Sequence, residues 1–559
     1  MKINSFFLTI LLPVFILATL NTSAQAPGWQ WAKKIGGSVT EIGHGVATDP
    51  SGNVIVTGCF TSPSLTVGTT TLTNSGVNTE ELFVIKYDAN GNVLWAKSAG
   101  GSAIEDARSV ATDLNGNIYV TGIFGSASIT FGSVTLNNTN ATSYDMFLVK
   151  YDAAGNVLWA KQAGGNSYDL GYFVCTDVSG NAIVAGYFSS SSMTIGTNTL
   201  TCPSPSENMF VAKYDANGNV LWAKAAGGAF DEYAHSVSCD PNGNIFVTGF
   251  FASATITFGT TTLTNASTGS YDIFIVKYDP NGNEVWAQSA GGTSVDGAES
   301  VSADANGNVF ITGYFASPGI VFGATTLTNS GASGDLFIVK YDSNGTVLWA
   351  KSVGGSSADV LGMCVTSDAG GNALVTGTFK SPTVTFGTYT LTNSTVWFVN
   401  AFVAKYDGAG NNVWAKSING NYEVNAYGIC TSPSGKILVT GYYQISPLVI
   451  GSTTLSNSGS NDMYVAMLDA TTSGIEDEIA LDGFSIYPNP SPGIININAA
   501  TMREEPLTVQ LTNTLGQIVL STTVSGKQSV LNIEHLPDGV YFVTLKNGKL
   551  IKTVKIQKE

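Results

Sequence analysis

Short apolar runs, separated by tight polar turns, recur along most of the chain. In LFVIKYD, residues 82–88, and NVLWA, residues 92–96, apolar side chains follow one another without the alternation of a half-exposed strand. Such runs predict strands that are covered on both faces, as in stacked sheets. The turn between them, DANGN at residues 88–92, carries the Asp, Asn and Gly that tight turns use.

The runs belong to a repeat that is marked by the tryptophan of a Trp-Ala pair. One unit, residues 95–158, contains four strand-like pieces and a long polar excursion between the second and third pieces. Four short antiparallel strands, repeated seven times and packed face to face, predict a β-propeller, and a linear solenoid is the alternative. The marking tryptophans are Trp31, Trp95, Trp159, Trp222, Trp286, Trp349 and Trp414.

The two ends of the repeat region complement each other. Six repeats end in a hairpin that leads into the Trp-Ala strand, whereas the seventh stops at MYVAMLDA, residues 463–470. WQWAKKIGG, residues 29–37, resembles the missing strand. We therefore predict an all-β fold in which residues 25–470 form a seven-bladed β-propeller closed by an N-terminal strand. Closure would remove an unpaired edge that invites aggregation.

The repeat disappears after residue 470. Residues 471–483 are acidic and are predicted to be a linker. Residues 484–559 contain period-two strands separated by Asn-Gly and Asp-Gly turns, which predict a small β-sandwich.

The N-terminal segment, residues 1–24, is typical of a signal peptide. It has a positive charge at Lys2, an apolar core, and small residues at Thr22 and Ala24 that suit cleavage after Ala24. An uncleaved anchor is the alternative, but the apolar run is short for a spanning helix. We expect no transmembrane segment after removal of the signal.

Six cysteines in an exported chain raise the question of disulfides. Cys175, Cys239, Cys364 and Cys430 fall in the same kind of strand in different repeats, and Cys59 and Cys202 have no equivalents. A disulfide framework usually recurs with its unit, so we interpret all six as buried thiols.

Charge and motif content narrow the classes of function. The net charge is −16, and Arg108 and Arg503 are the two arginines, so we expect no nucleic-acid partner. The three histidines are scattered, and GxSxG, HExxH and CxxC motifs do not occur.

A carboxylate stands ten residues after each tryptophan, or nine in the last repeat. We expect these acids near the mouth of the channel, on the face with long variable loops. They would bind cations such as calcium or a basic partner, or they would accept hydrogen bonds from NH groups of their own loops. Otherwise no cofactor is expected. The acids are Glu41, Glu105, Asp169, Glu232, Asp296, Asp359 and Glu423.

A second position, thirteen residues after each tryptophan, differs from repeat to repeat. A position that varies among repeating neighbours is expected to be exposed and to contact a ligand. Its residues are His44, Arg108, Tyr172, His235, Glu299, Gly362 and Tyr427.

The sixth repeat has an apolar excursion, STVWFVNA, at residues 394–401. Trp397 and Phe398 could anchor a partner, as aromatic hot spots do, or fill a gap under the loop.

The repeats resemble a known family. GNxxVTG, FVxKYDxxGNVLW and a following GG with an acidic residue are similar to the SBBP-type β-propeller repeat of secreted bacterial proteins. The seventh unit departs from the pattern at Gly435–Lys436 and at its LDA end. This resemblance implies a fold and an extracellular location, and it implies no catalytic residues.

The tail resembles a second family. YPNP, TLGQ and LPDGVYFV occur in order within residues 484–559 and are similar to the C-terminal sorting domain of the type IX secretion system of Bacteroidetes. The resemblance implies that the type IX machinery is a partner and that the protein is secreted or attached to the outer-membrane surface. A sandwich module that binds carbohydrate is the alternative.

We therefore expect a non-catalytic binding or scaffold protein with a protein or glycan ligand on the propeller face. The alternative is a secreted carbohydrate-active or other hydrolytic enzyme that uses carboxylates of that face.

Overall fold

The computed structural model describes the chain in several segments. These are residues 26–76, 79–202, 206–331, 333–355, 359–393, 395, 397–444, 447–469, 484–499, 507–514, 517–524, 528–547 and 550–559. The predicted signal peptide, residues 1–24, and the predicted linker, residues 471–483, lie outside the described residues. Every regular element among the described residues is a β-strand. Accordingly, no described segment forms a helix able to cross a membrane.

The chain divides into two compact units, residues 1–472 and 473–559. In the described part of the first unit, seven four-stranded antiparallel sheets follow one another along the sequence. Each sheet begins with an inner strand. The inner strands are β2 (Glu41–Thr48), β8 (Glu105–Thr112), β14 (Asp169–Thr176), β20 (Glu232–Cys239), β26 (Asp296–Ala303), β32 (Val360–Ser367) and β38 (Val424–Thr431).

The second and third strands of each sheet form its buried centre. The second strands are β3 (Val54–Phe60), β9 (Ile118–Phe124), β15 (Ala182–Phe188), β21 (Ile245–Phe251), β27 (Val309–Phe315), β33 (Ala373–Phe379) and β39 (Ile437–Gln444). The third strands are β6 (Glu81–Tyr87), β12 (Asp145–Tyr151), β18 (Asn208–Tyr214), β24 (Asp272–Tyr278), β30 (Asp335–Tyr341), β36 (Asn400–Tyr406) and β42 (Asn461–Leu468).

An outer strand completes each sheet, and a two-stranded hairpin fills each excursion. The outer strands are β7 (Val93–Ala99), β13 (Val157–Ala163), β19 (Val220–Ala226), β25 (Glu284–Ala290), β31 (Val347–Val353), β37 (Asn412–Ile418) and β1 (Trp29–Ile35). The hairpins are β4–β5 (Ser64–Val67, Thr70–Thr73), β10–β11 (Ser128–Phe131, Val134–Asn137), β16–β17 (Ser192–Ile195, Asn198–Thr201), β22–β23 (Thr255–Phe258, Thr261–Thr264), β28–β29 (Gly319–Phe322, Thr325–Thr328), β34–β35 (Thr383–Phe386, Tyr389–Thr392) and β40–β41 (Leu448–Ile450, Thr453–Leu455).

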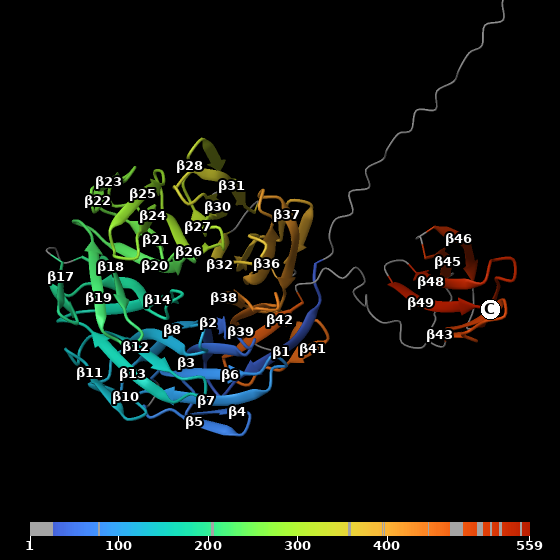
Figure 1. Cartoon of the computed structure of the whole chain (residues 1–559), viewed down its shortest axis with the longest axis horizontal. Helices are drawn as coiled ribbons and strands as arrows, with labels where there is room; N and C mark the ends of the chain where they lie inside the picture. Colours follow the sequence, from blue (N-terminus) through green and yellow to red (C-terminus); the bar gives the residue numbers. More distant parts are fainter. Residues whose placement is uncertain are drawn as a thin grey trace, which may run out of the picture. The chain divides into compact units, whose positions relative to one another are not determined.

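The sheets are arranged in a ring around the inner strands, as in a β-propeller (Figure 1). Each inner strand contacts the inner strands of both neighbouring sheets, and β38 contacts β2. The core lies between adjacent sheets: Val84 of one sheet clusters with Val120 and Phe147 of the next. All residues of β3 and β6 are buried, which is why their apolar runs are continuous.

The N-terminal strand β1 belongs to the last sheet. It pairs antiparallel with β42, with Ala32 opposite Ala466 and Ile35 opposite Met463, and the sheet order is β1-β42-β39-β38. Lys34 adds an ion pair with Asp462 at 3.1 Å.

The outer tryptophans connect neighbouring sheets. Trp31 Nε1 donates to Ala89 O in the next sheet at 3.1 Å. Gly91, in the same turn, has a φ of 78°, and a Cβ atom at this position would lie 3.2 Å from the Trp31 ring. Glycine is therefore required both by the turn and by the tryptophan that packs on it.

The second unit contains two sheets. One has the order β43-β44-β47 (Phe484–Tyr487, Ile494–Ala499, Gln528–Asn532), and the other has the order β46-β45-β48-β49 (Ile518–Val524, Leu507–Asn513, Gly539–Asn547, Leu550–Lys558). Its core includes Ile495, Leu511, Val543 and Ile556.

Candidate functional site

The repeated DxxGN turns are built as self-contained turns. Asp88 Oδ1 accepts hydrogen bonds from the NH groups of Asn90 and Asn92, each at 2.8 Å, and Oδ2 accepts one from Asn92 Nδ2. These bonds lower the pKa of Asp88, with the Asn92 side chain as the main cause. The carboxylate thus serves the turn itself.

Five of the ring acids are buried and accept hydrogen bonds from NH groups of their own loops, the second of the two arrangements expected for them. Asp169 is an example: Oδ2 accepts hydrogen bonds from Gly165 N and Ser190 Oγ, both at 2.7 Å, and burial raises the pKa of Asp169 to about 7. Each of the five acids accepts one hydrogen bond from the NH group of the second glycine of its GG loop and another from the backbone NH or the hydroxyl group of a serine after the second strand. These fully buried acids are Glu41, Glu105, Asp169, Glu232 and Asp296.

The remaining two acids, Asp359 and Glu423, do not occupy the equivalent position. The first residues of β32 and β38 are Val360 and Val424, which pair with the second strands as Glu41 does. Asp359 is exposed, and Glu423 accepts a hydrogen bond from Tyr442 Oη at 2.7 Å. The seven acids therefore do not form one ring.

The variable position is a β-bulge in each inner strand. In β2, Gly43 pairs with Gly58 and Gly45 with Thr57, so His44 between them has no partner residue in the register. In β32 the bulged residue is Met363, and the predicted Gly362 is paired with Gly377. The seven bulged residues are His44, Arg108, Tyr172, His235, Glu299, Met363 and Tyr427, and all are half-buried.

Six bulged residues form a continuous chain of contacts across neighbouring sheets. The rings of Tyr427 and His44 have centroids 5.7 Å apart. His44 and Arg108 share Asp106, with His44 Nε2 3.4 Å from Oδ1 and Arg108 Nε 2.7 Å from Oδ2. Burial acts to raise the pKa of Asp106, but His44 and Arg108 outweigh it and lower the pKa to about 2.

The chain continues on the far side of Arg108, whose Cζ lies 5.8 Å from the Tyr172 ring centroid. Tyr172 stacks on His235 at 4.5 Å, with an angle of 20° between the rings. His235 Nδ1 lies 2.8 Å from Glu299 Oε2. The chain of contacts thus runs twice through a tyrosine, a histidine and a charged residue.

A second layer of aromatic residues surrounds His235. Its ring centroid lies 4.6 Å from that of Phe250 and 6.1 Å from that of Tyr233. Tyr233 in turn meets Tyr187 edge-on at 4.6 Å and lies 6.0 Å from Tyr271. These residues are absent from the predicted site, although they occupy positions that also vary between repeats.

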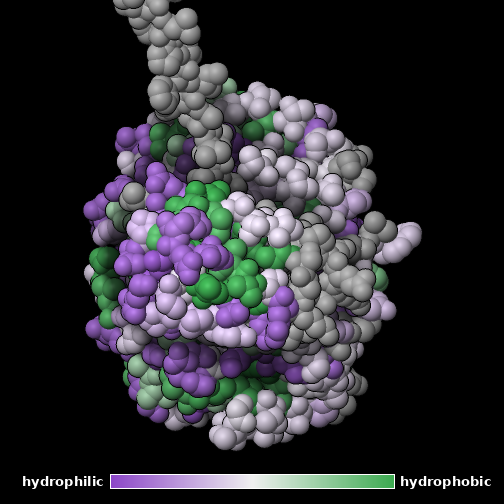
Figure 2. Space-filling model, turned by 90° about the vertical axis from the view of Figure 1, so that its right-hand side faces the viewer, coloured by the Kyte–Doolittle hydropathy of each residue, from purple (hydrophilic) through white to green (hydrophobic). Residues whose placement is uncertain are grey.

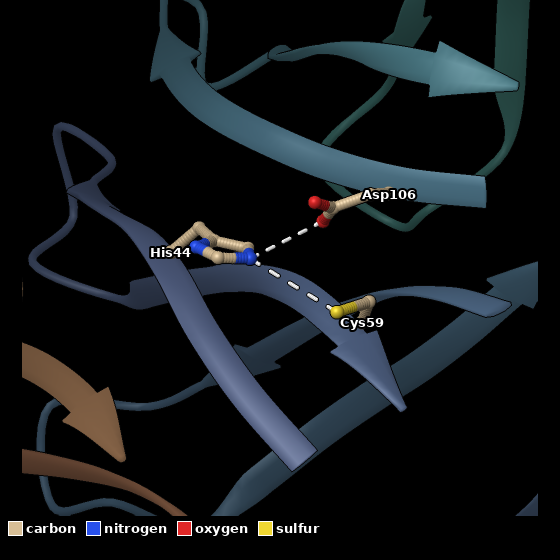
Figure 3. A group of neighbouring side chains, drawn as sticks. All are labelled: His44, Cys59 and Asp106. Carbon is tan, nitrogen blue, oxygen red and sulfur yellow. Dashed lines mark hydrogen bonds and ion pairs between the residues drawn. The ribbon is translucent and has the colours of Figure 1, made fainter. Parts of the chain in front are cut away.

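A compact polar cluster lies between the first and second sheets (Figure 3). His44 Nε2 points toward both Cys59 Sγ, at 4.0 Å, and Asp106 Oδ1. The donor atoms of the three residues all lie within 4.8 Å of one another, and Cys59 and Asp106 are buried. Imidazole, thiolate and carboxylate are the ligands that zinc prefers. Among the described residues, this is the group whose donors could hold a metal.

The two aromatic residues of the sixth excursion separate in the structure. Trp397 is 79% exposed, whereas Phe398 packs on Tyr422 with ring centroids 5.0 Å apart. Trp397 is therefore available for contact, and Phe398 fills the space under the loop.

Hollows on the surface recur at equivalent positions in different sheets. A hollow of about 310 Å³ at the rim is lined by Phe258, Tyr278 and Glu284, and Phe131 and Tyr151 line a similar one two sheets earlier. Such hollows belong to the packing of the outer strands. On the face shown in Figure 2, hydrophobic and hydrophilic residues lie side by side.

Two of the comparisons concern the tail and the curated relatives. Residues 485–559 match the family described as "Secretion system C-terminal sorting domain". An uncharacterised WD repeat-containing protein of Acanthamoeba polyphaga mimivirus is 26% identical over 432 residues, covering 64% of this chain and 31% of the relative. The regulatory protein FlaEY of Caulobacter vibrioides is 23% identical over 346 residues, covering 59% of this chain and 33% of the relative. The match thus spans about a third of each relative.

The third comparison concerns solved structures. PorZ, described as an essential bacterial surface component of the type-IX secretion system of Porphyromonas gingivalis, is 11% identical, with a TM-score of 0.22. The match covers 94% of this chain and 100% of PorZ. We draw no conclusion from a likeness at that TM-score. The sorting tail supports a secreted or surface-attached location for the protein.

Proposed function

We propose that this protein is a closed, seven-bladed propeller that binds an oligosaccharide without catalysis at the cell surface. Its tail, residues 484–559, would engage the type IX secretion machinery. The bulged ring, defined as His44, Arg108, Tyr172, His235, Glu299 and Tyr427, would form the ligand site.

One observation carries the proposal: the bulged ring differs from blade to blade on a scaffold that is otherwise repeated. Its members touch one another instead of making the same contact seven times, and they keep part of their surface in solvent. Variable residues on a rigid scaffold are typical of binding sites.

The chemistry of the ring favours a sugar. Tyr172 and His235 offer flat apolar faces, while Arg108 and Glu299 offer a donor and an acceptor at the two ends of the stack. Aromatic walls with a few fixed polar groups are typical of small-ligand sites.

Catalysis has weaker support in this ring. The pair of His235 and Glu299 resembles a base with its orienting carboxylate, but no bond from a serine, threonine or cysteine to His235 occurs among the described residues. The non-catalytic function is therefore the better supported of the two.

The test is a glycan array, with a protein array alongside, probed with the full secreted chain. We expect an oligosaccharide hit that Tyr172→Ala weakens at least about tenfold, as loss of a central aromatic contact does. Leu158→Ala, at an exposed apolar residue of the outer strand β13, is the matched control and should bind normally. Binding only to proteins, equal binding by wild type and Tyr172→Ala, or cleavage of the bound glycan would each contradict the proposal.

A further inference from the structure

We propose that His44, Cys59 and Asp106 hold a zinc ion between the first two sheets. The strands that carry the three ligands are β2, β3 and β8. The zinc site shares His44 with the bulged ring, but it does not depend on which ligand the propeller binds.

The spacing of the donor atoms suits one tetrahedral ion. With zinc bonds of about 2.0–2.3 Å, donors on the same ion lie roughly 3.3–3.8 Å apart. His44 Nε2 and Asp106 Oδ1 are 3.4 Å apart, and His44 Nε2 and Cys59 Sγ are 4.0 Å apart. The second distance is slightly longer than this range, and all three donor atoms lie within 4.8 Å of one another, so zinc would draw them closer together on binding.

The arrangement differs from that of a nucleophilic cysteine. In a Cys-His-Asp triad the thiol and the carboxylate contact opposite nitrogens of the imidazole. Here Cys59 and Asp106 both face the same Nε2 atom, as ligands around a common cation do (Figure 3). Cys59 is also only 2% exposed, which shields it from a substrate.

One buried oxygen of the cluster lacks a proper donor. Asp106 is 1% exposed, and Oδ1 receives no well-directed hydrogen bond within the described part of the chain. Leaving such an oxygen unsatisfied is costly, and a cation would satisfy it. Arg108 lies on the other oxygen, Oδ2, so Oδ1 faces only His44 Nε2, at 3.4 Å, among the ion pairs of this carboxylate.

The charges of the cluster balance when zinc is bound. The Glu80 side chain hydrogen-bonds with the Cys59 thiol, which places a second carboxylate beside the ligands. The Cys59 thiolate, Glu80 and Asp106 together carry three negative charges, which offset one Zn²⁺ and the Arg108 guanidinium. On binding, the sulfur–zinc bond forms as the thiol proton passes to solvent, and no electrons are transferred.

The test measures zinc in the full secreted chain with no affinity tag. The protein is stripped with a chelator, titrated with zinc chloride against a competing chelator, and dialysed. We expect one zinc per chain, and cobalt substituted for zinc should give a thiolate-to-cobalt charge-transfer band. Cys59→Ser should weaken zinc binding at least about tenfold and remove the band. Cys430→Ser, in the inner strand β38, is the matched control and should behave as wild type.

Unfolding of the metal-free variants separates loss of a ligand from loss of the fold. If Cys59→Ser unfolds like metal-free wild type but no longer gains thermal stability from zinc, the proposal stands. A wild type that retains no zinc, or a Cys59→Ser variant with unchanged affinity, overturns it.

A second inference rests on an independent observation: we infer that Cys175 and Cys239 form a disulfide after export. Their sulfurs lie 2.8 Å apart, in the inner strands β14 and β20 of neighbouring sheets. At the Cys239 position of five other sheets a hydroxyl group bridges to the preceding sheet, as when Thr176 Oγ1 donates to Thr112 O. In this sheet a cysteine replaces that hydroxyl and faces a second cysteine.

The bond would form by thiol–disulfide exchange with the disulfide of an oxidant protein in the compartment into which the chain is exported. The two thiols lose two protons and two electrons, one S–S bond forms, and the oxidant's disulfide is reduced to two thiols. Cys239 lines a hollow of about 210 Å³, which gives the oxidant access.

Peptide mass spectrometry of the secreted, unreduced and alkylated chain tests this inference. We expect a Cys175–Cys239 cross-linked peptide that reduction or Cys239→Ser removes, together with a lower midpoint of thermal unfolding in both cases. Cys364 and Cys430 are the internal controls and should be alkylated. Full alkylation of Cys175 and Cys239 in the unreduced chain would overturn the inference.

Discussion

The two ends of each blade behave in opposite ways. At one end, the turns of six blades begin with the same aspartate, and the outer tryptophan of one blade donates to the turn between the third and outer strands of the next, as Trp31 does to Ala89 O and Trp95 to Ala153 O. At the bulge the residues differ, and they touch one another around the channel. The residues that repeat in the blades make the contacts that hold neighbouring blades together. The residues that vary, at the bulges, are free to bind a ligand.

Deleting residues 26–35 should have the largest effect on stability. Without β1, the last sheet loses its outer strand and β42 has an unpaired edge, so the first and last blades can separate. We expect a large drop in the midpoint of urea unfolding and aggregation of the product.

Lys34→Ala is the graded control for the deletion. It removes the ion pair with the buried Asp462 but keeps the strand, so it should destabilise the chain less than the deletion does. Equal midpoints for the deletion and wild type would mean that β1 does not close the ring.

Lys213→Met should be the next most damaging change. Lys213 is 4% exposed, and its Nζ lies 2.9 Å from Asp177 Oδ2 and donates to Pro280 O of the next blade. Removing one partner of a buried ion pair costs about 3–5 kcal/mol, which urea unfolding measures. Lys224→Met, at an exposed lysine, is the control, and adding Asp177→Asn to Lys213→Met should recover part of the loss.

The strands, the turns and the repeat were predictable because they depend on local patterns. The continuous apolar runs predicted strands covered on both faces, and the full burial of β3 and β6 confirms that prediction. The turns could be predicted from their Asn and Gly residues without knowledge of tertiary contacts, because Asp88 accepts hydrogen bonds from NH groups of its own turn.

The register of the inner strands was predicted wrongly in the sixth blade for a physical reason. Positions were counted forward from the tryptophan, across the loop to the next blade, and that loop changes length before Val360. Counting back twelve residues from the VTG-type triplet crosses only the fixed inner hairpin. From Val375 this count gives Met363, and from Val56 it gives His44, both of which are bulged residues.

The burial of the acids was not predictable from spacing. A carboxylate at the start of a strand suits an exposed rim and a buried loop anchor equally well. Packing decides between them: Gly165, from the loop that precedes Asp169, and Ser190, 21 residues further along the chain, both donate to the Asp169 carboxylate and enclose it.

Asp169→Asn should reveal a smaller, pH-dependent effect. Burial raises the pKa of Asp169 to about 7 in the folded chain, from 3.8 as the ordinary value. The folded state thus holds this proton more tightly, so its stabilising effect is complete below about pH 4 and is lost as the pH rises through about 7. Relative to wild type, Asp169→Asn should gain on the order of 1–3 kcal/mol between pH 5 and pH 8, by urea unfolding.

Asp88→Asn is the control for this pH dependence and has the opposite sign. Hydrogen bonds lower the pKa of Asp88, so its contribution is present above its ordinary pKa and is lost as the pH falls. A difference between Asp169→Asn and wild type that does not change with pH would show that Asp169 titrates normally.

Tyr172→Ala should have the smallest effect on stability. It therefore gives the most direct comparison between the bulged ring and the buried scaffold. Tyr172 is half-buried at a bulge and stacks on His235, a contact worth about 0.5–1.5 kcal/mol. Tyr214, at the end of the third strand β18, is 1% exposed, and truncating a buried aromatic of that size costs about 3–5 kcal/mol. Urea unfolding of Tyr172→Ala and Tyr214→Ala therefore compares one residue type in the two regions. If the two variants lose equal stability, the bulged ring is part of the scaffold, and its variation from blade to blade requires an explanation other than recognition.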